Sequence, residues 1–246
     1  MVPSFPSPFR NEKVRHTECA NPVYAADISS GCTKVVAASW GTTDNVRLFG
    51  IGSRTQLLPP ISHRKADGVK FSPDGSRFAT ASDDSGVRVY NTHDGSILFD
   101  SSAQCATEAR TPLAWSADGQ QLFVASQGKV TSVNISNSSS SEWPIHETQS
   151  SVSIASNGKF IACSAGKSAS LWDCVSHRQI GSIITHTAGI NCIALSPSGM
   201  YLACGVGKNI TIHDLRDALP SQYFDRGSST HPHNATISTR PHNAAV

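Results

Sequence analysis

The chain has 246 residues, of which 38% are hydrophobic and 15% are charged, and its formal net charge is +2 at pH 7. So small an excess of positive charge excludes a strongly basic nucleic-acid-binding chain, and no apolar run approaches the roughly 18 residues of a membrane span. We therefore expect a folded domain with neither nucleic acid nor membrane as a partner, whose binding sites depend on local clusters of residues.

Residues 1–21 are expected to form an extension that precedes the folded domain. Three prolines fall within the first eight positions, and the segment lacks the apolar stretch of a secretory signal peptide. The chain has seven cysteines, an odd number, and Cys163 and Cys204 follow repeated glycines at the same offset. This pattern favours buried, reduced thiols in a cytoplasmic or nuclear protein.

Residues 22–224 contain a motif that occurs five times. A glycine in a polar turn recurs at intervals of 44, 44, 39 and 41 residues, close to the period of about 40 to 45 residues for one blade of a β-propeller. The spacing predicts one domain of five consecutive blades, at about residues 22–62, 63–104, 105–145, 146–185 and 186–224. The five glycines are Gly31, Gly75, Gly119, Gly158 and Gly199.

The second repeat shows the expected strands most clearly. Residues 68–71, 77–82 and 87–91 alternate between apolar and polar side chains, and Pro73-Asp74-Gly75 lies between the first two of these segments. Residues 97–99 are expected to form the outer edge. Period-two alternation that is interrupted by such turn residues predicts short antiparallel strands. Each repeat is therefore expected to fold as a four-stranded sheet.

The residues of these turns resemble those of a known family. Ser72-Pro73-Asp74-Gly75 is followed, nine residues after the glycine, by Asp84, and the fourth repeat contains Trp172-Asp173. This pattern resembles the WD-repeat β-propellers, and the composition of the units is most similar to the expanded WD-repeat proteins of basidiomycete fungi. The resemblance implies an all-β fold. Closed rings of the family usually have more blades, so we expect an incomplete ring that further blades or a second copy would complete.

In WD-repeat propellers, a hydrogen-bonded tetrad of histidine, serine or threonine, aspartate and tryptophan ties an inter-blade loop to two strands. The resemblance implies that the second repeat carries this structural tetrad, with tyrosine in the place of tryptophan. In the fifth repeat His186 is present but Gly207 replaces the aspartate, and that blade is expected to hold by packing. The tetrad residues of the second repeat are His63, Thr80 or Ser82, Asp84 and Tyr90.

Three repeats carry a Gly-Lys pair in the turn expected between their second and third strands, at residues 128–129, 166–167 and 207–208. The resemblance implies that these turns lie on the top face of the propeller, beside the inter-blade loops. A basic arc there would suit an acidic or phosphorylated ligand, whereas the alternative is that each lysine is an ordinary solvated turn residue. The candidate partner-binding residues are Arg64, Lys65, Lys129, Lys167 and Lys208.

No motif indicates catalysis, a cofactor or a metal. The segment Ala165-Gly166-Lys167-Ser168 imitates the end of a phosphate-binding loop, but Ile161 occupies the position of the earlier glycine that such a loop requires. Asp27 is the one carboxylate that we expect on the inner strands. Residues 225–246 are predicted to form a disordered tail whose histidines are solvated, because a flexible tail gives a metal no fixed geometry.

These features together predict a non-enzymatic protein-interaction scaffold that binds a peptide or a protein domain on its top face. Two alternatives remain open. One is a truncated, non-functional WD-repeat paralogue, which the small number of blades favours. The other is an enzyme on a propeller scaffold, for which the inner strands would have to bring together several carboxylates, histidines or metal ligands.

Overall fold

The computed structural model describes residues 21–82, 85–101, 113–126, 128–146 and 152–224. These residues form eighteen β-strands in five antiparallel sheets and one 3-10 helix, η1 (Ser221–Tyr223). The expected N-terminal extension, apart from Asn21, and the expected C-terminal tail lie outside the described residues. Among the described residues, no helix has the length and hydrophobicity needed to span a bilayer.

Each sheet is one blade, and its strands follow chain order from one edge to the other. The first blade contains β1 (Val23–Ile28), β2 (Lys34–Ser39) and β3 (Val46–Gly50). The second contains β4 (Ala66–Phe71), β5 (Arg77–Ser82), β6 (Gly86–Asn91) and β7 (Ile97–Ser101). The third contains β8 (Leu113–Trp115), β9 (Gln121–Ser126), β10 (Lys129–Asn134) and β11 (Ser140–Pro144).

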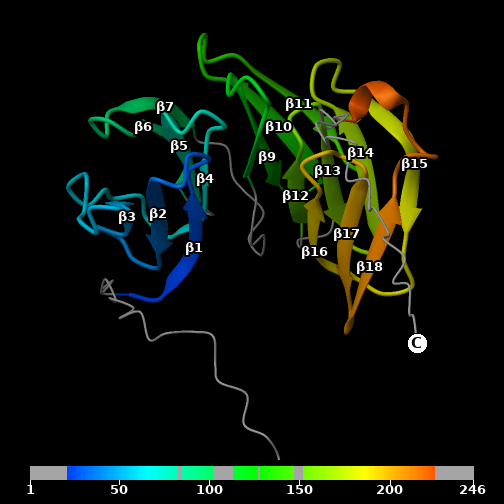
Figure 1. The fold of residues 1–246 in the computed structure, drawn as a ribbon, viewed down its shortest axis with the longest axis horizontal. Helices are drawn as coiled ribbons and strands as arrows, with labels where there is room; N and C mark the ends of the chain where they lie inside the picture. The colour runs from blue at the N-terminus through cyan, green and yellow to red at the C-terminus, as the bar shows by residue number, and fades with distance from the viewer. Residues whose placement is uncertain (1–20, 83–84, 102–112, 127, 147–151, 225–246) are drawn as a thin grey trace, which may run out of the picture.

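The fourth blade contains β12 (Val152–Ser156), β13 (Phe160–Ala165), β14 (Ser168–Asp173) and β15 (Gln179–Thr185). The fifth contains β16 (Ile190–Leu195), β17 (Tyr201–Val206) and β18 (Asn209–Asp214). Figure 1 shows the blades following one another around a common centre, with β1 and β16 on opposite sides of it. The all-β class and the five-bladed propeller predicted from the repeat spacing are confirmed.

The repeated glycines mark the turn between the first and second strands of a blade. At Gly158 a Cβ atom would lie 2.6 Å from the Cβ of Ala117 in the neighbouring turn, so the two blades approach too closely there for any side chain. Four of the repeated glycines also adopt the left-handed backbone conformation, which glycine reaches without steric penalty. They are Gly75, Gly119, Gly158 and Gly199, with φ angles of 68°, 65°, 89° and 77°.

Four apolar cores lie between neighbouring blades, and each joins one face of a sheet to the opposite face of the next. The strand β13 shows how this works. Its Ile161 and Cys163 are buried against the third blade, whereas Phe160 and Ala162, which alternate with them, are buried against the fifth. Because successive side chains of a strand point to opposite faces, a strand between two blades can be buried along its whole length, as β13 is.

The structure differs from the predicted four strands in the first blade, whose sheet contains three strands among the described residues. The segment after β3 forms two isolated bridges with it, Phe49 with Gln56 and Val46 with Ile61. Pro59-Pro60 lies just before the second bridge. Because proline has no backbone N–H, this segment cannot form a continuous ladder.

The fifth blade also has three strands among the described residues, because the chain after β18 packs back onto the fourth blade. Tyr223 and Phe224 are buried in the core between these two blades. The Tyr223 hydroxyl donates a hydrogen bond of 3.0 Å to Asp173, and the Asn157 amide donates one of 3.1 Å to the Tyr223 carbonyl. These contacts fix the segment against β14 and the turn that follows β12.

The two ends of the arc leave apolar sheet faces exposed. Ile210 and Ile212 of β18 are 77% and 67% exposed. Ala169 and Leu171, at the equivalent positions of β14, are buried beneath the fifth blade. At the other end of the arc, Tyr24 of β1 is 57% exposed. Among the described residues no apolar core joins the first blade to the fifth, which is the arrangement expected of an incomplete ring.

The propeller has two rims that carry different loops. The top rim carries the turns between second and third strands together with the inter-blade loops. These are in contact, because the loop into the fifth blade donates backbone hydrogen bonds of 2.8 and 2.9 Å to Gly166 and Lys167. The bottom rim carries the turns between first and second strands. They also contact one another, as the Ser30 hydroxyl does when it donates a hydrogen bond of 2.6 Å to the Pro73 carbonyl.

Candidate functional site

The candidate basic residues Arg64, Lys65, Lys167 and Lys208 lie on the top rim. Arg64 and Lys65 follow the buried His63 in the loop that leads into the second blade. Lys167 and Lys208 occupy equivalent turns, each one residue before the strand β14 or β18 begins, and both are exposed. Two hairpin tips of adjacent blades therefore present a cation at the same position.

Lys129 does not share this position. It is the first residue of β10 and pairs with Ser126, whereas Lys167 and Lys208 lie between the paired residues of their hairpins. Its ammonium group forms hydrogen bonds of 2.8 and 2.9 Å with both carboxylate oxygens of Glu142 on the neighbouring strand β11. This interaction lowers the pKa of Glu142. The Gly-Lys pair of the third repeat is thus shifted by one residue, and its charge is already paired.

Trp40 is a top-rim residue that the sequence analysis did not single out. It is 44% exposed, and the Lys65 ammonium lies 5.7 Å from the centre of its ring, within the range of a cation–π interaction. The backbone N–H of Lys65 also donates a hydrogen bond of 2.8 Å to the carbonyl of Gly41. Tryptophan is enriched among the interface residues that carry most of the binding energy, but the sequence around Trp40 gives no sign of its exposure.

His63 connects the first blade to the second through both its backbone and its ring. Its backbone N–H donates a hydrogen bond of 2.9 Å to the Asn45 side chain, which returns one of 2.7 Å to the His63 carbonyl. Its Nδ1 lies 2.5 Å from Oγ1 of Thr80 in β5. Both His63 and Thr80 are fully buried. The loop is therefore fixed to the first blade, at the turn before β3, and to β5 of the second, at a point that water does not reach.

The other members of the expected tetrad have different surroundings. Ser82 donates a hydrogen bond of 2.7 Å to the Arg64 carbonyl, which fixes the loop a second time. The Tyr90 hydroxyl is buried, and burial raises its pKa. Among the described residues it has no hydrogen-bond partner. Asp84 lies outside the described residues.

A cavity of about 820 Å³ occupies the centre of the arc and is lined by residues of all five inner strands. Asp27 is the one carboxylate in its described lining. Its side chain accepts hydrogen bonds of 2.8 Å from the backbone of Phe71 and 3.0 Å from Lys70, and so links the first blade to the second. Asp27 therefore has a structural role, and the described lining brings together no set of catalytic groups.

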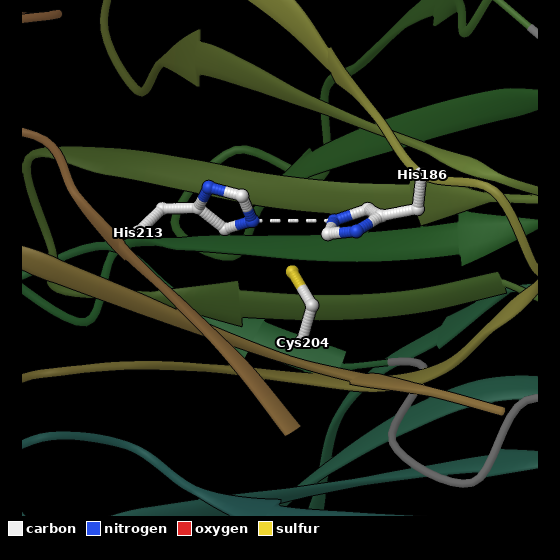
Figure 2. A group of neighbouring side chains, drawn as sticks. All are labelled: His186, Cys204 and His213. Carbon is white, nitrogen blue, oxygen red and sulfur yellow. Dashed lines mark hydrogen bonds between the residues drawn. The ribbon is translucent and has the colours of Figure 1, made fainter. Parts of the chain in front are cut away.

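In the fifth blade, three side chains occupy the positions that His63, Thr80 and Tyr90 occupy in the second. They are His186, Cys204 and His213, whose nitrogen and sulfur atoms all lie within 4.8 Å of one another. Figure 2 shows the Cys204 sulfur directed towards the two imidazole rings. The sequence analysis did not connect Cys204 with His213, because the replacement of the aspartate by Gly207 led us to expect a blade held by packing.

Comparison with family models gives one match. The family described as "WD40: WD domain, G-beta repeat" matches residues 61–91, 137–173 and 177–214. The second and third segments begin just before β11 and β15, which are outer strands, and end with the third strand of the next blade. Each of these repeats thus spans two blades. Comparison with curated proteins gives no significant match. The matched repeats and the five-bladed propeller support the assignment of the chain to a WD-repeat family.

Proposed function

We propose that the protein is an interaction scaffold whose top rim binds an acidic or phosphorylated peptide, or a protein domain that presents one. WD-repeat propellers are typically non-enzymatic scaffolds, and the one carboxylate in the described cavity lining is engaged by Lys70. The observation that carries the proposal is the repeated exposure of Lys167 and Lys208 at equivalent hairpin tips. Carboxylate and phosphate groups are the natural ligands of such a row of cations.

The loop into the second blade would extend this surface. Arg64 is exposed, and Lys65 lies over the exposed ring of Trp40. Tryptophan and arginine are the residues on which binding energy most often concentrates in protein interfaces. In this proposal the aromatic ring gives apolar contact area, and the lysines orient the negative charges of the partner. We place the protein in the cytoplasm or nucleus, and its similarity to the fungal WD-repeat proteins stays a hypothesis.

The exposed end faces of the arc extend the proposal to the completion of the ring. Each of the four internal cores forms between one face of a sheet and the opposite face of the next sheet. At the ends of the arc one such face stays exposed in the first blade, at Tyr24, and one in the fifth blade, at Ile210. A further blade or a second copy of the chain offers the matching apolar sheet. Size-exclusion chromatography with light scattering tests this. A discrete dimer or a stable compact monomer agrees with a working scaffold, whereas polydisperse aggregates favour the non-functional paralogue.

Peptide binding tests the proposed function. Fluorescence anisotropy would follow the binding of a labelled glutamate-rich peptide and of its phosphoserine-containing counterpart to the full chain. The double variant Lys167→Ser/Lys208→Ser is expected to bind at least about tenfold more weakly, a difference of ~1.4 kcal/mol. Raising the salt concentration should weaken binding to the parent, because exposed charges are screened over about 8 to 10 Å at physiological ionic strength.

Lys129→Ser is the matched control for this experiment. Its ammonium is paired with Glu142, so its removal should change peptide affinity little. Neither variant should move the thermal midpoint appreciably, because exposed charges contribute little to stability. If the double variant binds as tightly as the parent, or if Lys129→Ser weakens binding equally, the hairpin tips are not the binding site.

A further inference from the structure

The fifth blade contains a cluster of metal-ligand side chains that the proposed function does not use. His186 lies in the loop that follows β15, Cys204 in β17 and His213 in β18. The Nε2 atoms of the two histidines are 3.2 Å apart, and Figure 2 shows them facing each other above the Cys204 sulfur. Three segments that are separate in the sequence thus direct their donor atoms to one point.

We propose that His186, Cys204 and His213 bind a divalent transition-metal ion of the zinc type. A tetrahedral zinc ion holds its nitrogen ligands at about 2.0 to 2.1 Å, which separates two of them by roughly 3.3 Å. The observed 3.2 Å between the histidine nitrogens matches this separation. The third ligand atom, the sulfur of Cys204, lies within 4.8 Å of both nitrogens, so small shifts of the three side chains would bring the sulfur into coordination.

The chemistry of the donors selects the class of metal. Two imidazoles and a thiolate suit zinc and related ions, whereas calcium and magnesium prefer oxygen ligands. Binding releases the thiol proton of Cys204 to solvent and leaves both imidazoles neutral. Cys204 is buried in the core between the fourth and fifth blades, while both histidines are only partly buried and give an ion access from the surface. Three protein ligands leave the fourth position for water.

Comparison with the second blade shows what is unusual about this cluster. There the equivalent residues are a histidine, a threonine and a tyrosine, and the histidine contacts the threonine hydroxyl at 2.5 Å. In the fifth blade the hydroxyl is replaced by a thiol and the tyrosine by a second imidazole. Both replacements convert a hydrogen-bonding group into a metal ligand. A bound ion would then connect the loop to two strands of its blade, whereas in the second blade the His63 ring contacts Thr80 of one strand, β5.

The experiment measures zinc binding by the full chain after removal of metal with a chelator. Competition with a chromophoric chelator gives the affinity, and Co²⁺ gives thiolate-to-metal charge-transfer absorption if a cysteine is a ligand. The parent should bind one ion per chain and unfold at a higher temperature when zinc is present. The variant Cys204→Thr/His213→Tyr carries the residues that the second blade has at these positions, Thr80 and Tyr90. Because the second blade folds with these residues, we expect the variant to fold.

This variant should bind zinc more than about 100-fold more weakly, since even outer-shell changes cost 10- to 100-fold in affinity. Two controls should bind as the parent does. Cys192→Ser removes an exposed thiol near the site, and replacing His231, His233 and His242 by glutamine removes the histidines near the C-terminus. Equal zinc affinity in the parent and the double variant, or loss of binding in either control, would overturn the proposal and leave a hydrogen-bonded histidine pair.

Discussion

Replacing Thr80 by valine tests the contact between His63 and β5 that connects the first two blades. Valine keeps the shape of the side chain but removes the hydroxyl that lies 2.5 Å from Nδ1 of His63. Both residues are fully buried, so water cannot replace the lost partner. Leaving a buried polar atom without this partner costs about 1 to 3 kcal/mol.

Urea unfolding followed by tryptophan fluorescence measures this loss. With an m-value of about 2 to 3 kcal/mol per molar, the midpoint should fall by roughly 0.3 to 1.5 M. Thr185→Val is the matched control, because Thr185 lies exposed in β15. Its effect should stay within about 0.5 kcal/mol. If the two variants unfold at the same urea concentration, the contact between His63 and Thr80 contributes nothing to stability and the account of this loop is wrong.

Three further predictions follow from contacts in the described residues. Asp27→Ala should lower the free energy of unfolding more than Lys70→Ala, because Asp27 also accepts a backbone hydrogen bond from the second blade whereas Lys70 is half exposed; equal urea midpoints would contradict this. Burial opposes the shift, but hydrogen bonds from neighbouring serines lower the pKa of Asp74 to about 2. The ionised Asp74 carboxylate therefore contributes fully to stability above the ordinary aspartate pKa of 3.8, and this contribution is lost as the pH falls towards 2. Asp74→Asn should thus make the thermal midpoint depend less on pH between these two values. Peptide mapping after brief alkylation should find Cys192 modified and Cys163 protected, because the first is exposed and burial raises the pKa of the second; equal labelling of both would indicate an open fold.

The features that could be predicted from the sequence are those that depend on local backbone chemistry. The blade period was visible because turns such as the one at Gly75 need a left-handed residue at a fixed place in each repeat. The family resemblance led us to expect that His63 contacts Thr80 or Ser82, and its Nδ1 lies 2.5 Å from Oγ1 of Thr80. The missing fourth strand of the first blade had a signal, Pro59-Pro60, whose effect on a ladder was overlooked.

Other features depend on how strands pair and pack, and these could not be predicted. The position of Lys129 differs from those of Lys167 and Lys208 by one residue because hairpin register is set by the whole sheet. The exposure of Trp40 depends on which other parts of the fold pack over the turn after β2, and this packing cannot be read from the residues around Trp40. The convergence of His186, Cys204 and His213 needs the alignment of two strands and a loop, which the family pattern alone does not supply.

Hydrogen exchange of the full chain, measured with and without a bound acidic peptide, tests most directly whether the top rim is the docking surface. We expect slower exchange in the top-rim segments at residues 64–65, 166–167 and 207–208, and little change in the bottom-rim turn at residues 73–76. Protection confined to the bottom rim, or to the strands that line the central cavity, would contradict the proposed docking surface.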